Sequence, residues 1–124
     1  MGFLIVFFGG GLGAAFRHGI NLIVAQILGT AFPYATMIEN VSGSLIMGML
    51  IAYFAFLGNT SQHVVLFLTT GILGGYTTFS AFSLDAARLY ESGEFGLAAL
   101  YVLASVALSI GGLFAGLALV RQFA

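Results

Sequence analysis

The side chains that could do chemistry in this sequence are few, and most of them interrupt long apolar stretches. One stretch, residues 33–57, carries Thr36, Glu39, Asn40, Ser42 and Ser44. The Asn40 amide can donate two hydrogen bonds, so it could hold a dehydrated anion or tie two helices together, and the spacing alone favours the helix contact. An ionised Glu39 would repel an anion, so this carboxylate is expected to point away, to pair with a cation such as Arg17, or to be protonated.

A second polar run lies in the middle of the third apolar stretch and reads Gly-Gly-Tyr-Thr-Thr-Phe-Ser-Ala-Phe-Ser, from Gly74 to Ser83. Adjacent glycines followed by β-branched threonines weaken a helix, so we expect a helix break near Gly74–Thr78. Carbonyl groups freed there must bind other protein groups, water or a cation. An intact helix with threonine side chains bonded back to its own carbonyls is the alternative.

Aromatic and hydroxyl side chains follow the break at helical spacing. Phe79 and Phe82 share a face, and their ring edges are the positive end of the ring quadrupole, which can contact a dehydrated anion. Phenylalanine more often packs in a core or faces lipid. In the last stretch, Tyr101, Ser105 and Ser109 form a hydroxyl stripe that could line a narrow path or bond neighbouring helices.

The elements that position these groups follow from composition. The chain has 124 residues, of which 60% are hydrophobic and only 6% charged, with no cysteine and a net charge of -1. This excludes a water-soluble fold and thiolate chemistry, and it argues against nucleic-acid binding. No nucleophile, base and orienting group can be assembled, so we expect no enzyme. We predict an all-α membrane protein with one domain, residues 1–124, and four spans: Gly2–Leu28, Pro33–Leu57, His63–Tyr90 and Phe95–Phe123.

Arginine placement bears on orientation in the membrane. The first span has no basic n-region and is expected to stay as a helix rather than be cleaved as a signal peptide. Arg121 lies on one side, Arg88 on the other and Arg17 within the first span, so the positive charges nearly balance. The balance favours insertion in both orientations and an antiparallel homodimer, with a single fixed orientation as the alternative. Small-residue faces such as Gly9–Gly13 are expected to pack helices closely.

Taken together, the glycine-rich first span ending in Arg17, the segment Asn40–Ser44, the run Gly74–Ser83 and the Tyr101/Ser105 stripe resemble the Fluc/CrcB family of fluoride channels over essentially the whole chain. The run at Gly74 is the most specific of these. The resemblance implies an antiparallel, dual-topology homodimer in the inner (plasma) membrane, with two narrow pathways that export fluoride passively.

The resemblance also implies roles for individual residues. Asn40 would bond fluoride, Phe79 and Phe82 would line its path, and Tyr101 and Ser105 would continue it. Backbone carbonyls of Gly74 and Thr77 from both subunits would hold a structural Na⁺. Other positions with an implied or electrostatic role are Thr36 and Ser80 on the pathway, Asp85 in gating, Arg17 in anion attraction, and Glu39, a departure from the family pattern.

A small dual-topology, proton-coupled multidrug exporter is the competing interpretation. In it, the membrane-embedded Glu39 would bind protons and a cationic drug in turn. Size, span number and charge balance fit this class equally well. The sequence has no tryptophan for an aromatic cation box, which counts against it.

Overall fold

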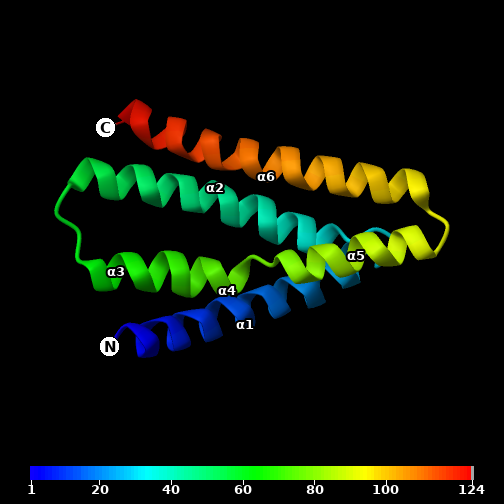
Figure 1. The fold of residues 1–124 in the computed structure, drawn as a ribbon, viewed down its shortest axis with the longest axis horizontal. Coiled ribbons are helices and arrows are strands. Elements are labelled where there is room, and N and C mark those ends of the chain that lie inside the picture. Colours follow the sequence, from blue (N-terminus) through cyan, green and yellow to red (C-terminus); the bar gives the residue numbers. More distant parts are fainter. Residues whose placement is uncertain (124) are drawn as a thin grey trace.

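The computed structural model describes residues 1–123, which form helices joined by short loops (Figure 1). The elements in chain order are α1 (Gly2–Leu28), α2 (Tyr34–Leu57), α3 (Gln62–Leu66), the π-helix η1 (Phe67–Leu73), α4 (Gly74–Tyr76), α5 (Phe79–Glu91) and α6 (Phe95–Phe123). In this described part, four helical segments are long and apolar enough to cross a membrane, with the run from Gln62 to Glu91 counted as one. The predicted all-α, four-span architecture is confirmed.

Three segment ends differ from expectation by one residue each. Pro33 precedes α2 instead of opening it, because its backbone (φ -79°, ψ 65°) is not helical. The third span runs from Gln62 to Glu91 rather than from His63 to Tyr90. Ser61 explains the earlier start, since its side chain accepts a hydrogen bond from the His63 N–H and caps the helix.

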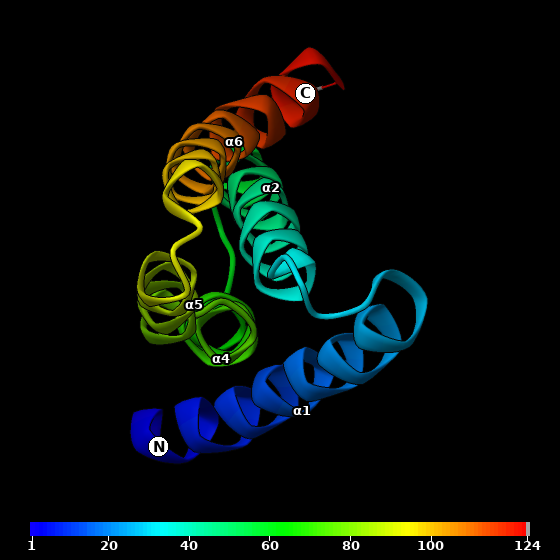
Figure 2. The same ribbon diagram turned by 90° about the vertical axis from the view of Figure 1, so that its right-hand side faces the viewer.

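The helices pack as two pairs. The α2 and α6 helices lie side by side along most of their length, and α1 lies along η1 and α4 (Figure 1). Viewed from the end of the bundle, α4 and α5 lie between α1 and α6, and α1 also contacts α2 (Figure 2). The amino and carboxyl ends lie at the same end of the bundle, as an even number of spans requires (Figure 1).

Glycines allow both pairs to pack closely. A methyl group on Gly9 would lie 2.9 Å from the Gly71 Cα atom, so α1 and η1 touch backbone to backbone. In the other pair, Gly116 of α6 packs against the Leu45 carbonyl of α2. The predicted use of small residues for helix contact is confirmed.

The third span contains the predicted break. Thr77 (φ -89°, ψ 155°) and Thr78 (φ -153°, ψ 123°) are extended, and helix resumes at Phe79. The break therefore occupies the last two residues of the expected window, while Gly74–Tyr76 remain helical. The seven-residue π-helix before it was not predicted, and π-helices are often found at functional sites.

Candidate functional site

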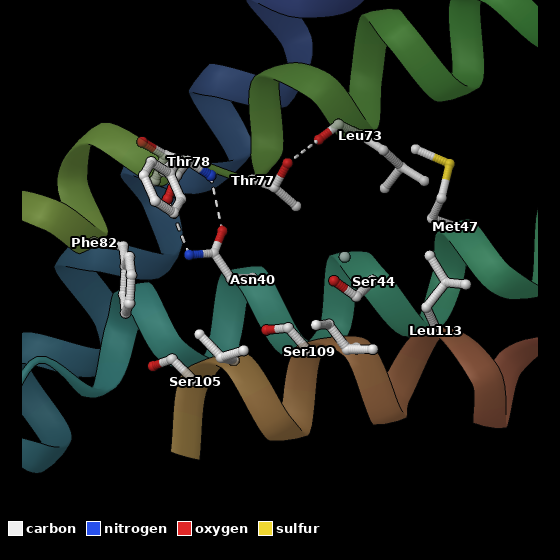
Figure 3. Close-up of a pocket in the computed structure, with 14 residues that line it drawn as sticks. Asn40, Ser44, Met47, Leu73, Thr77, Thr78, Phe82, Ser105, Ser109 and Leu113 are labelled. Atoms are coloured by element: carbon white, nitrogen blue, oxygen red, sulfur yellow. Dashed lines mark hydrogen bonds between the residues drawn. The ribbon is translucent and has the colours of Figure 1, made fainter. Parts of the chain in front are cut away.

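The helix break is held by one side chain from the neighbouring span. The Asn40 Nδ2 atom donates to the Thr78 carbonyl oxygen at 3.0 Å, and the Thr78 N–H donates to Asn40 Oδ1 at 2.8 Å (Figure 3). This pair of bonds satisfies the unwound backbone at Thr78, which lipid would otherwise penalise. The helix-contact role that spacing favoured for Asn40 is therefore present, and one amide hydrogen of the Nδ2 group is left for another acceptor.

The same bonds leave two backbone carbonyls without their helical donors. In a continuous helix the Thr78 N–H would bond the Gly74 carbonyl and the Ala81 N–H would bond the Thr77 carbonyl. Here Thr78 donates to Asn40, and Ala81 donates to Thr78 Oγ1 at 3.1 Å. The Thr77 hydroxyl bonds back to the Leu73 carbonyl at 2.9 Å, so threonine back-bonding accompanies the break rather than replacing it.

A cavity of about 520 Å³, here called the central cavity, lies between the break and the α2 and α6 pair. Figure 3 shows Asn40 reaching from α2 toward Thr78, with Ser105 and Ser109 on the α6 side. Most of its wall is apolar, and its polar groups are a few amides and hydroxyls. The lining residues are Asn40, Gly43, Ser44, Met47, Leu73, Thr77, Thr78, Phe79, Phe82, Ser105, Val106, Ser109, Ile110 and Leu113.

The two phenylalanines after the break both line this cavity, as their shared helical face predicts. Their ring centroids are 5.5 Å apart at an interplanar angle of 49°. Phe82 is 9% exposed and packs on Tyr101, with ring centroids 5.3 Å apart, whereas Phe79 is 77% exposed in the single chain. Phe82 thus belongs to the core as well as to the cavity wall, while Phe79 contributes mainly to the wall.

The hydroxyl stripe of α6 divides between two environments. Ser105 and Ser109 line the central cavity, and within residues 1–123 the buried Ser105 Oγ atom has no hydrogen-bond partner. Tyr101 is fully buried, and its hydroxyl donates to Asp85 Oδ2 at 3.1 Å. It lies one helical turn from Ser105, outside the lining of the central cavity as far as the structure describes it.

A second cavity, of about 460 Å³, opens at one end of the bundle and is called the outer cavity. Its wall is more polar and includes the only basic side chain in either cavity lining of the described chain, Arg88. Thr36 and Asp85 also line this cavity. The full lining is Asn21, Val24, Ala25, Gly29, Thr30, Ala31, Phe32, Pro33, Tyr34, Ala35, Thr36, Asp85, Arg88, Leu89 and Ser92.

The charged side chains of Arg17 and Glu39 do not pair with each other in the part of the chain that the structure describes. The Arg17 Nε–H donates to the Gly75 carbonyl at 3.1 Å, beside the break. Glu39 is fully buried, and neither of its carboxylate oxygens has a hydrogen-bond partner among residues 1–123. Of the three arrangements expected for Glu39, pairing with Arg17 is not formed among residues 1–123, because no hydrogen bond or ion pair joins the two side chains.

Some site residues lie elsewhere than expected and others were missed. Ser80 lies outside the central lining in the described chain, and its hydroxyl is 3.3 Å from Thr78 Oγ1. Thr78, the cap of α5 and the partner of Asn40, was not singled out, although a threonine just before a resumed helix is a capping signal. Arg88 was used only for orientation, because nothing local in the sequence predicts that it faces a cavity.

A four-span bundle with a broken helix, a mostly apolar inner cavity and a more polar outer one defines a multi-pass membrane protein with its polar groups gathered inside. Residues 4–117 match the family described as CrcB-like protein, Camphor Resistance (CrcB), and the chain belongs to that family.

Similar proteins support the same assignment over nearly their whole length. The "Fluoride-specific ion channel FluC" of Rhodopseudomonas palustris (strain BisB5) is 72% identical, with 98% of each chain covered. The "Fluoride-specific ion channel FluC 2" of Nitrobacter hamburgensis is 61% identical over 98% of each chain. The FluC protein of Methylobacterium nodulans is 59% identical over 97% of this chain and 96% of its own. The resemblance inferred from the motifs is confirmed, and the names of these relatives describe channels rather than drug exporters.

Proposed function

We propose that this protein is a fluoride-selective passive channel that exports fluoride from the cytoplasm across the plasma membrane. The observation that carries the proposal is the convergence of the free Asn40 amide hydrogen, the Phe79 and Phe82 rings and the Ser105 hydroxyl on the central cavity. The choice of fluoride as the ion rests on the high sequence identity, over nearly the full chain, to relatives named as fluoride-specific channels.

The cavity chemistry suits a small anion that must lose water. An amide N–H and a hydroxyl can each donate a hydrogen bond, and ring edges present positive charge, so together they replace part of a hydration shell. The surrounding wall is apolar, so an anion too large to touch several donors at once would not be compensated for its lost water. We propose that selectivity over chloride comes from a path too narrow for the larger anion.

Export needs no coupled energy source. Fluoride enters cells as neutral HF and is trapped inside as the anion. An inside-negative membrane potential drives anions outward with about 2.3 kcal/mol per elementary charge for each 100 mV. A conductive path is therefore sufficient, and this is why we propose a channel rather than a pump.

We further propose that two copies assemble as an antiparallel, dual-topology homodimer with two fluoride pathways and a structural Na⁺ between them. The Gly74 and Thr77 carbonyls, both without their helical donors, suit a hard cation that prefers oxygen ligands. Four such carbonyls from two copies would hold Na⁺, which would neutralise the negative ends of the peptide dipoles at the break. The near balance of arginines across the membrane supports the two orientations.

The test of the channel is fluoride efflux from liposomes that contain the purified protein, with valinomycin to carry K⁺ and chloride as the comparison anion. We expect rapid fluoride loss that requires valinomycin, with chloride retained. Absence of valinomycin-dependent fluoride loss from folded protein would contradict the channel. Uptake of a cationic drug driven by a proton gradient and lost in Glu39→Gln would instead support the exporter.

A further inference from the structure

Among the residues that the structure describes, Glu39 is the one fully buried acidic side chain, and the proposed pathway does not yet use it. Its side chain is fully buried, and within the described residues both carboxylate oxygens lack hydrogen-bond partners. It is buried inside a single chain, so a second copy has no surface there through which to supply a partner. A role at the subunit interface is therefore excluded, and the reason for this carboxyl group must lie within the bundle.

The position of Glu39 along α2 is between the two cavities. Thr36, one turn before it, lines the outer cavity, and Asn40 and Gly43 after it line the central cavity. The α5 helix shows the same order. On α5, Phe82 lines the central cavity and Asp85 the outer one. On α6, the fully buried Tyr101 lies one turn before Ser105 of the central cavity.

Glu39 and Tyr101 are the two largest fully buried side chains of the described chain, and neither lines either cavity as the structure describes them. The distance from the Thr36 level to the Asn40 level on α2 is about 6 Å, at 1.5 Å of rise per residue. An ion that moved along α2 from the outer cavity to the central one would pass the level of Glu39.

The surroundings of Glu39 favour a neutral carboxyl group. Burial acts most strongly against a charged carboxylate here. Arg17 from α1 attracts a carboxylate, although its Nε–H is donated to the Gly75 carbonyl, and Asp85 from α5 repels one. Tyr101 of α6 faces it as well, but the tyrosine hydroxyl hydrogen is donated to Asp85. An ionised carboxylate without a partner costs several kcal/mol in such a site, whereas a protonated one is neutral and carries an O–H donor.

We propose that Glu39 carries a proton and donates a hydrogen bond to the anion as it crosses from one cavity to the other. Loss of the proton removes the donor and places a negative charge in the passage, so conduction falls as the pH rises. This inference rests on the proposed fluoride channel and adds to it a residue that makes conduction depend on pH.

The test compares three variants in the valinomycin efflux assay, with equal pH on both sides of the membrane and protein-free liposomes subtracted. Glu39→Gln keeps an N–H donor and cannot ionise, Glu39→Leu removes the donor, and Glu94→Gln in the exposed loop is the matched control. We expect the wild type and Glu94→Gln to lose about tenfold in flux between about pH 6 and about pH 9, and Glu39→Gln to stay within about twofold across that range. Glu39→Leu should be slower than Glu39→Gln by about tenfold at every pH.

A second measurement reports the proton without using transport. The infrared C=O stretch of a protonated carboxylic acid should be present in the wild type at the low end of this range and absent from Glu39→Gln. A missing band overturns the inference, as does an identical pH profile in wild type and Glu39→Gln, or equal flux in Glu39→Leu and Glu39→Gln. No flux from any protein at any pH would instead refute the proposed channel, while the infrared band would still report the proton.

Discussion

The two cavities of this protein differ in what they offer an anion. The outer cavity, at the end of the bundle, has Arg88, Asp85 and several amide and hydroxyl groups in its wall. The central cavity, beside the helix break, is mostly apolar, and its donors are an amide and a few hydroxyls. The first suits a hydrated ion held by long-range charge, and the second suits an ion that has lost water. Mutations in the two cavities should therefore differ in the size of their effect and in its dependence on salt.

Asn40→Ala should have the largest effect, because Asn40 both donates into the central cavity and holds the break at Thr78. We expect fluoride flux to fall by about 100-fold or more, and unfolding free energy to fall by about 1–3 kcal/mol for the backbone groups left unpaired. The checks are liposome efflux and thermal unfolding in detergent. The matched control is Asn21→Ala in the outer cavity, and an equal loss in that variant would remove the distinction between the cavities.

Substitutions of Phe79 and Phe82 should have the second largest effect on flux. Comparing the two should distinguish an effect on conduction from an effect on stability. Phe79→Ile removes a ring edge from an exposed position, so flux should fall by about tenfold with thermal stability unchanged. Phe82→Ile should lower flux as well, and it should also lower the unfolding free energy by about 1–2 kcal/mol because Phe82 packs in the core on Tyr101.

Phe114→Ile, at an exposed position of α6 outside both cavity linings of the described residues, is the control for this pair. Its flux and stability should match those of the wild type. Normal flux in both Phe79→Ile and Phe82→Ile would contradict the contribution of ring edges to the central cavity.

The contrast between the cavities also shows how far sequence reasoning could reach. The four spans, the break and the shared face of Phe79 and Phe82 follow from local patterns: hydropathy, adjacent glycines and helical spacing. The clamp between Asn40 and Thr78 joins residues 38 positions apart, and no local pattern indicates which helix face meets which. The same limit applies to Arg88, which enters the outer cavity only because α1, α2 and α5 come together at that end of the bundle.

Arg17 and Glu39 show that local sequence patterns also fail to indicate which partner a charged side chain binds. Opposite charges in an apolar chain are expected to pair, and the sequence offers few other partners. The break, however, exposes the Gly75 carbonyl to Arg17, and that neutral acceptor takes the arginine. The sequence does not show where the unwound backbone needs a donor. It therefore could not predict that Arg17 would bond a backbone carbonyl instead of pairing with Glu39.

Ser105→Ala should have a moderate effect on flux and almost none on stability. Within residues 1–123 its buried hydroxyl has no protein partner, so the folded chain loses no hydrogen bond when it is removed. An anion in the central cavity would lose one donor, which we expect to slow fluoride flux by about three- to tenfold. Fluoride efflux and thermal unfolding, measured on the same variant, distinguish a role of Ser105 in conduction from a role in packing. A large drop in stability with normal flux would show that Ser105 serves packing and not the ion.

Arg88→Gln should have the smallest effect and the one most sensitive to salt. A basic side chain in the wide outer cavity raises the local anion concentration without touching an ion that has lost its water, so its loss should slow flux by about two- to threefold at low ionic strength. At about 1 M salt the Debye length is about 3 Å, so the difference from wild type should vanish. Arg121→Gln, near the carboxyl end of α6 and outside both described cavity linings, should match the wild type in both conditions. A deficit in Arg88→Gln that persists at high salt would mean that Arg88 binds the ion directly, and the outer cavity would then share the work of dehydration with the central one.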